Sequence, residues 1–307
     1  MSVTGMGRLG MLVILLAVLA TGASACSPGT AADSGGHSDS LAALQQGAVS
    51  YTLIEAQSSL PVGAGRFVFG VAPSKGEPVS GLSPQVWVGR EQGSPARGPF
   101  PARWVTWTAP QTDRYGAPPV PGFYEADIVI PAPGKWSVLA RATVNGRAVA
   151  ALGDIPVYAN PSASVGSPAI GTSTPVADSP EAAAAIDTRD PPTPMHYVSL
   201  DTALSNGLPT VLVFATPLLC ESRMCGSVVD EVLDVYDHVG RTRANFVDVE
   251  IYPTRDTNRP APAFLRWRFE SEPWVLVIDR SGTVRGRFEG PVVSPEIQAA
   301  LQPLLSS

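Results

Sequence analysis

The sequence predicts a multidomain chain in which an all-β sandwich over residues 47–160 precedes an α/β domain over residues 195–307. The length of 307 residues exceeds that of one ordinary domain. The 31 prolines and 29 glycines, with only 16% charged residues, indicate many turns and short strands. Short β-type runs fill the first half, whereas strands and helices alternate after residue 195. An all-helical protein is therefore excluded.

The N-terminus has the features of an export signal over residues 1–25. Arg8 precedes the apolar run 11–20, which is too short to cross a bilayer as a helix. The sequence Ala23-Ser24-Ala25-Cys26 resembles the lipoprotein box of bacteria, which implies lipidation of Cys26 and an extracytoplasmic protein anchored to the cell membrane. Lipidation would leave the other two of the three cysteines as an even pair. Plain secretion with a spare thiol remains the alternative.

Two segments have the composition of tethers. Residues 26–46 are small and polar, and residues 161–194 are rich in Pro, Ala and Ser with few large apolar side chains. We expect a flexible N-terminal tether and an interdomain linker. The two halves should then move independently unless they share a sizeable interface.

Seven β-type runs separated by turn residues predict the sandwich. They cover residues 51–54, 66–71, 85–88, 104–107, 124–130, 136–144 and 147–152. Asn145-Gly146 predicts a two-residue hairpin turn, because both residues tolerate positive φ. The segment 122–146 resembles those of small immunoglobulin-like domains in exported bacterial proteins, so we expect an immunoglobulin-like structural or binding module.

The second half follows a β-α-β order. A short helix at 201–206 precedes a buried strand at 209–215 and then the cysteines. An amphipathic helix over 229–239 leads to a strand at 244–252, a hairpin over 272–279 and 283–288, and a capped helix from Ser294. The helix carries an acidic run, Asp230, Glu231, Asp234 and Asp237, which we expect on a solvated face. His196 is expected to be exposed.

These features resemble the thioredoxin-like family over residues 195–307. The residues that match are LPTVLVFAT before a cysteine pair, the proline-led hairpin EPWVLVIDRSGTVRGRFEG, and the last helix. The resemblance implies that Pro273 is cis and faces the cysteines. Glu272 and Pro273 would then form a docking edge for a thiol substrate, because a cis proline presents free backbone groups to an extended peptide.

The cysteine spacing departs from the Trp-Cys-x-x-Cys of that family. Four residues separate Cys220 from Cys225, and in a regular helix this spacing gives a rise of about 7.5 Å, beyond the ~7 Å limit for a disulfide. Either Cys220 lies in a loop before the helix, or oxidation unwinds the first turn. Some peroxiredoxins share the spacing, but Pro217 stands where their motif has Thr or Ser.

The cysteine pair is the candidate chemical centre. Cys220 is the candidate nucleophile, with helix N–H groups and Arg223 stabilising its thiolate, and Cys225 is the resolving partner. The predicted function is thiol–disulfide exchange with exported proteins, without a cofactor or a resident metal. The alternatives are a non-catalytic scaffold with a structural disulfide, or a Cu(I) metallochaperone. The net charge of −6 argues against a nucleic-acid partner.

Overall fold

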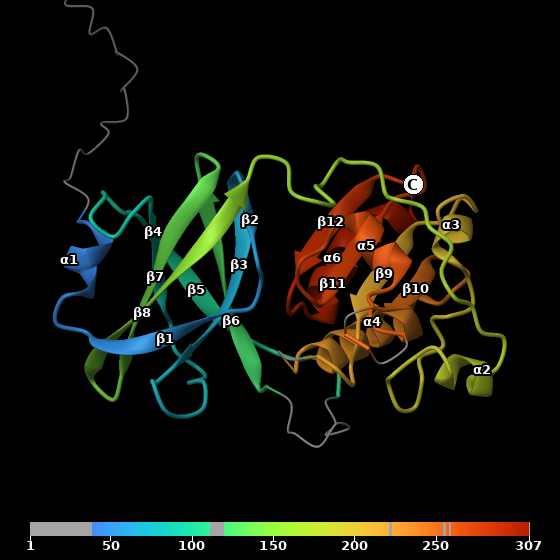
Figure 1. Ribbon diagram of the computed structural model, residues 1–307, viewed down its shortest axis with the longest axis horizontal. Helices are drawn as coiled ribbons and strands as arrows, with labels where there is room; N and C mark the ends of the chain where they lie inside the picture. Colours follow the sequence, from blue (N-terminus) through green and yellow to red (C-terminus); the bar gives the residue numbers. More distant parts are fainter. Residues whose placement is uncertain (1–38, 111–119, 221–222, 254–255, 258, 307) are drawn as a thin grey trace, which may run out of the picture. The chain divides into compact units, whose positions relative to one another are not determined.

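The computed structural model describes residues 39–110, 120–220, 223–253, 256–257 and 259–306 (Figure 1). The predicted signal peptide and the predicted lipidation site, Cys26, lie outside these ranges. None of the helices within them combines the length and the apolar character needed to cross a bilayer.

The first half is built from one β-sheet that closes on itself. Its main strands are β1 (Val49–Glu55), β3 (Gly63–Ala72), β4 (Gln85–Gly89), β5 (Arg97–Thr106), β6 (Gly122–Ile130), β7 (Gly134–Val144) and β8 (Arg147–Tyr158). The order is β1-β3-β6-β5-β4-β7-β8, and β8 pairs back onto β1. The short β2 (Leu60–Pro61) adds to the far end of β8, and α1 (Leu41–Gln45) precedes the first strand.

The predicted immunoglobulin-like sandwich is therefore wrong, and the structure has a closed seven-stranded barrel instead. Closure comes from a parallel pairing of residues 49–52 with residues 149–152, at the start of the long strand β8. In a sandwich these strands would remain in separate sheets. The barrel interior is filled by buried aromatic side chains that include Phe67, Phe69, Tyr124 and Trp136.

Each predicted β-type run overlaps a strand of the barrel, although β5 begins at Arg97 and not at 104, and β8 ends at Tyr158 and not at 152. The predicted hairpin turn is confirmed. Asn145 and Gly146 have φ values of 50° and 75° and join β7 to β8. Positive φ at both central residues gives the turn a twist that matches the flanking strands.

The second half contains a four-stranded sheet with the order β10-β9-β11-β12. The strands are β9 (Thr210–Ala215), β10 (Asn245–Glu250), β11 (Trp274–Ile278) and β12 (Val284–Glu289). The helices are α2 (Pro180–Ala184), α3 (Leu200–Ala203), α4 (Cys225–Val239), α5 (Pro262–Trp267) and α6 (Ser294–Leu305). Residues of α4 and α6 pack on one face of the sheet, and residues of α3 and α5 on the other.

The second half also corrects the predicted fold class. Strand β9 is parallel to β10 and antiparallel to β11, and two of the covering helices are only four and six residues long. With so little helix on one face, the chain is not a clear combination of a thioredoxin-like α/β domain and an immunoglobulin-like sandwich. It is a closed barrel followed by a four-stranded mixed sheet.

The segment predicted to be a linker, residues 161–194, packs against the second sheet. At one edge Gly166 N–H donates to the Val284 carbonyl, and Val284 N–H donates to the Ser167 carbonyl. The segment therefore lies beside the start of β12, at the outer edge of the sheet. At the other edge the residue that follows the segment, Met195, accepts a hydrogen bond from Asp248 N–H of β10. Both edges of the four-stranded sheet thus carry backbone partners.

Buried carboxylates connect the barrel to the second half. Glu231 of α4 is fully buried and accepts hydrogen bonds from Thr108 N–H (2.6 Å), Thr108 Oγ1 (2.5 Å), Ala109 N–H (2.9 Å) and Ser294 N–H (2.7 Å). Asp230 is also buried and pairs with Arg189. The prediction of a solvated acidic face is therefore wrong for these two residues.

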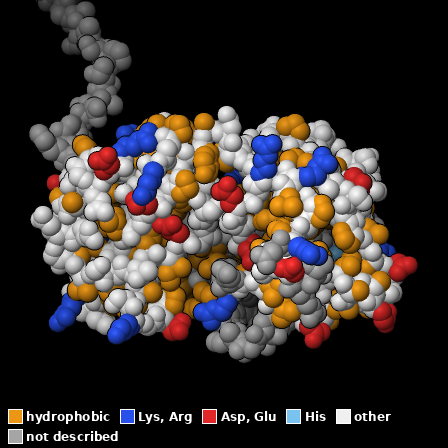
Figure 2. Space-filling view, viewed as in Figure 1, with side chains coloured by type: hydrophobic (Ala, Val, Ile, Leu, Met, Phe, Trp, Pro, Cys, Tyr) orange, Lys and Arg blue, Asp and Glu red, His pale blue; other side chains and the backbone are white. Residues whose placement is uncertain are grey.

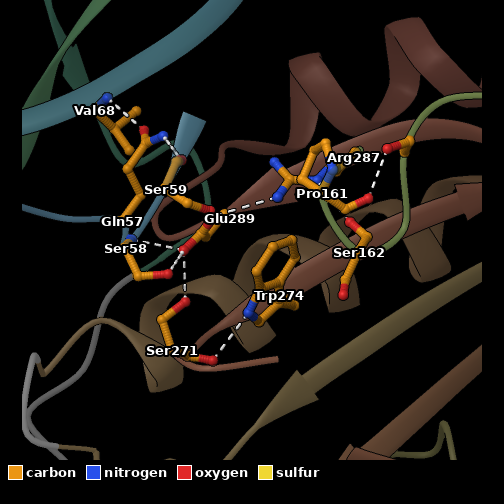
Figure 3. Close-up of polar contacts among 11 residues, drawn as sticks. Gln57, Ser58, Ser59, Val68, Pro161, Ser162, Ser271, Trp274, Arg287 and Glu289 are labelled. Carbon is orange, nitrogen blue, oxygen red and sulfur yellow. Dashed lines mark hydrogen bonds and ion pairs between the residues drawn. The ribbon is translucent and has the colours of Figure 1, made fainter. Parts of the chain in front are cut away.

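Glu289 at the end of β12 makes a second connection (Figure 3). It accepts hydrogen bonds from Ser58 of the barrel half and from Ser271, and Arg287 lies 3.4 Å from its Oε2. The next residue, Gly290, has a φ of 75°, and a Cβ there would collide with the Ala56 carbonyl oxygen. The positive φ and the closeness of the Ala56 backbone both require glycine at position 290.

Charged side chains of both signs are interspersed on the face of the molecule in Figure 2. No continuous basic area is visible on that face.

Candidate functional site

The cysteine pair lies between the central strand β9 and the helix α4. Cys220 is in the loop that follows the strand, and Cys225 is the first residue of the helix. The two form a disulfide with a Cα–Cα distance of 6.0 Å, inside the usual range. Of the two arrangements left open by the spacing, the structure has the first, in which Cys220 precedes the helix and folds back onto its first turn.

The two sulfurs have different surroundings. Cys225 is fully buried among core residues of α4 and the sheet, whereas Cys220 is half-buried. The N–H of Cys225 donates to the Cys220 sulfur across 3.3 Å. A backbone N–H at a helix start stabilises negative charge, so this contact favours a thiolate on Cys220 when the bond is reduced.

Arg223 helps to shape the loop through its backbone. It has a φ of 58°, and its N–H donates to the Cys220 carbonyl across 3.1 Å. Its side chain is exposed. The proposed action of its guanidinium on the thiolate stays a prediction.

The predicted docking edge lies next to the sulfurs. The Glu272–Pro273 peptide bond is cis, and a carboxylate oxygen of Glu272 lies within 4.8 Å of both cysteine sulfurs. Pro273 is buried and its carbonyl accepts a hydrogen bond from Gly290 N–H (2.9 Å). The structure therefore brings together Cys220, Cys225 and Glu272.

A pocket of 390 Å³ opens beside this group. Its walls include Leu219, Tyr252, Phe264, Phe269 and Glu272. Its remaining lining residues are polar, namely Thr257, Glu270 and Ser271, so the pocket combines aromatic and aliphatic surface with groups that can hydrogen-bond a peptide.

A second polar cluster is buried at the β10 edge, and the sequence interpretation missed it. Asp187 accepts hydrogen bonds from Arg189 N–H and Thr193 N–H (both 2.7 Å) and lies 3.0 Å from His196 Nε2. His196 is only 3% exposed, so the expectation that it is exposed was wrong. Asp248 is 3.9 Å from the same ring nitrogen.

These groups shift one another's titration. Burial alone would lower the pKa of His196, but its hydrogen bond with Asp187 and the charges of Asp248, Asp187 and Glu250 raise it. Burial and the charge of Asp187 raise the pKa of Asp248. Burial and the charge of Asp187 thus oppose ionisation of Asp248, while the neighbouring carboxylates favour the protonated form of His196.

Glu250 joins this cluster to the cysteine loop. Its Oε2 accepts a hydrogen bond from Thr188 N–H (2.7 Å), and Thr188 Oγ1 accepts one from Leu218 N–H (3.2 Å) two residues before Cys220. Burial raises the pKa of Glu250 to about 7. One signal in the sequence could have revealed these residues. Asp248 and Glu250 alternate with valines in a strand that is expected to be buried, so their carboxylates need polar partners inside the protein.

Among the residues that the structure describes, two groups of side chains bring three candidate metal ligands together. They are Cys220, Cys225 and Glu272, and Asp187, His196 and Asp248. In the first group the two sulfurs are bonded to each other, and in the second Asp187 and His196 already pair. Neither arrangement favours a resident metal in the oxidised protein.

Comparison with known proteins gave no matching family model and no matching curated protein. Among solved structures, a thiol:disulfide interchange protein of the thioredoxin family from Chlorobium tepidum TLS is 19% identical, with a TM-score of 0.27, covering 45% of this chain and 99% of its own. A structure of titin M4 is 12% identical, with a TM-score of 0.19, covering 35% and 93%. At these TM-scores neither likeness establishes a shared fold.

Proposed function

We propose that this protein exchanges thiols and disulfides with other exported proteins through Cys220 and Cys225. The observation that carries the proposal is the asymmetry of the pair. Cys220 is partly accessible and its sulfur receives the N–H of the helix start, while Cys225 is sealed in the core. An accessible, stabilised attacking thiol and a shielded resolving thiol are what exchange requires.

The exchange proceeds in two steps. In the reduced protein the Cys220 thiolate attacks a substrate disulfide, forms a Cys220–substrate bond and releases the other substrate sulfur as a thiolate. Cys225 then loses its proton and attacks Cys220 Sγ. The Cys220–Cys225 bond forms, and the second substrate sulfur leaves with the electron pair and takes up the proton. The reverse sequence oxidises a substrate dithiol.

Attachment to the membrane outside the cytoplasm through a lipid on Cys26 is part of the proposal. It is supported by the sequence Ala23-Ser24-Ala25-Cys26 after an apolar run. Disulfides persist in such a compartment, which agrees with the bonded pair.

Trapping of mixed disulfides tests the function. In a Cys26→Ser background, Cys225→Ser should accumulate adducts with exported proteins, because the variant lacks the thiol that releases the substrate from Cys220. Cys220→Ser should give about tenfold less adduct, since its remaining thiol is buried. Adducts are counted by non-reducing electrophoresis and mass spectrometry.

The scaffold alternative gives the opposite result. If neither variant forms adducts, and the disulfide resists reduction at potentials down to about −300 mV, the bond is a structural staple and the proposal is wrong.

A further inference from the structure

We infer that the Glu272 carboxylate is the proton acceptor for the resolving thiol of Cys225. The inference rests on the proposed exchange function and assigns a chemical role to a residue expected only to dock substrate. It starts from the geometry: one carboxylate oxygen and the two sulfurs all lie within 4.8 Å of one another. A side-chain rotation or one bridging water closes such a distance.

The buried thiol needs such a partner. Cys225 is fully buried, so water has little access to its proton, and burial disfavours the thiolate that must attack. The N–H contact at the helix start is made to Cys220 and therefore favours charge on the other sulfur. Half-buried Glu272 lies at the mouth of the site, beside the 390 Å³ pocket, and can pass a proton onward.

Proton transfer accompanies the attack that resolves the mixed disulfide. The Cys225 thiol gives its proton to the Glu272 carboxylate while its sulfur attacks Cys220 Sγ. The bond from Cys220 to the substrate sulfur breaks, and the leaving thiolate takes the proton from the carboxylic acid. In the reverse direction the protonated Glu272 protonates the departing Cys225 thiolate, so one residue serves oxidation and reduction.

The size of the effect follows from thiol ionisation. With an ordinary pKa near 8.5, only about 3% of a thiol is ionised at pH 7, so proton acceptance can accelerate attack by up to about thirtyfold. As the pH rises the thiol ionises without help, and the advantage shrinks. A carboxylate that acted by its charge alone would instead disfavour the thiolate, and its removal would speed the attack.

The test uses the reduced full-length protein with Cys26→Ser and the aromatic disulfide 5,5′-dithiobis(2-nitrobenzoate). Release of the first nitrothiobenzoate reports attack by Cys220, and release of the second reports resolution by Cys225. Glu272→Gln should not slow the first phase, because loss of a negative charge near Cys220 cannot disfavour its thiolate, and should slow the second phase at least about tenfold at pH 7, with a difference that shrinks as the pH rises.

Matched variants separate the role from a structural effect. Glu272→Asp keeps the carboxylate and should restore most of the second phase. Glu91→Gln changes an exposed carboxylate of the barrel half, outside the pocket, and should alter neither phase. An unchanged or faster second phase in Glu272→Gln overturns the inference while leaving the function intact. Absence of both phases in the parent refutes the function itself.

Discussion

The two carboxyl oxygens of the buried Glu250 differ in their hydrogen bonds. Oε2 receives Thr188 N–H, whereas Oε1 is buried without a hydrogen-bond partner among the described residues. Burial favours the neutral form of this carboxyl group and is the largest cause of the rise in its pKa to about 7. The folded protein therefore binds a proton in a pH range where the unfolded chain has lost it.

The stability of the protein should accordingly fall as the pH rises from about 4.5 to about 7. The folded pKa of Glu250 lies above the unfolded value, so its protonated form stabilises the fold at low pH and its ionisation costs up to about 3 kcal/mol by pH 8. Glu250→Gln should remove this part of the pH dependence in urea unfolding curves. Glu91→Gln, an exposed barrel residue, should leave it unchanged. Equal pH dependence in parent and Glu250→Gln would contradict the assignment.

At this scale the sequence predicts the residue types of the site better than their surroundings. Cys220, Cys225 and Glu272 could be named from local motifs, because the features that identify them lie within a few residues of chain. The burial of Glu231 and His196 could not, since it depends on Thr108 and Asp187, which no local periodicity connects to them.

At the scale of the elements, the conformation of the segment 187–196 depends on the side chain of Asp187. Asp187 receives three hydrogen bonds from within it, from Arg189 N–H, Thr193 N–H and His196 Nε2. The segment carries Thr188, whose hydroxyl holds the loop before Cys220. Order in this segment therefore supports the geometry of the cysteine loop.

Asp187→Asn should destabilise this segment and the fold. An amide can offer only one oxygen, so at least one buried donor loses its acceptor, at a cost of about 2 kcal/mol. Hydrogen exchange of residues 187–196 should accelerate, and reduction of the disulfide by dithiothreitol should become faster. Asp190→Asn, an exposed neighbour, is the control. Unchanged exchange in Asp187→Asn would show that the segment is held by other contacts.

Strands and helices were predictable because each leaves a local pattern, as the alternating burial of residues 126–130 in β6 and the apolar spacing in α4 illustrate. The closure of the barrel was not, because it rests on β1 pairing with a strand about a hundred residues later in the chain, at residues 149–152. The same seven strands, without that pairing, would satisfy the sandwich that the sequence suggests.

At the scale of the whole molecule, Glu231 connects the barrel to the helix that begins at Cys225. Glu231→Gln places an amide where both oxygens now accept hydrogen bonds, so N–H groups of Thr108 or Ser294 would face another donor. We expect a loss of about 3 kcal/mol in the free energy of unfolding. Asp237→Asn, exposed on the same helix, should cost little. Equal losses in the two variants, measured by urea denaturation, would rule out the connecting role.

The backbone partners at the two borders of the four-stranded sheet have a consequence for association between copies of the chain. A bare sheet border offers unpaired N–H and carbonyl groups to any passing chain and so invites polymerisation. Here Gly166 and Ser167 occupy such groups at Val284 of β12, and Met195 occupies one at Asp248 of β10. A strand from another copy would have to displace these partners before it could add to either border.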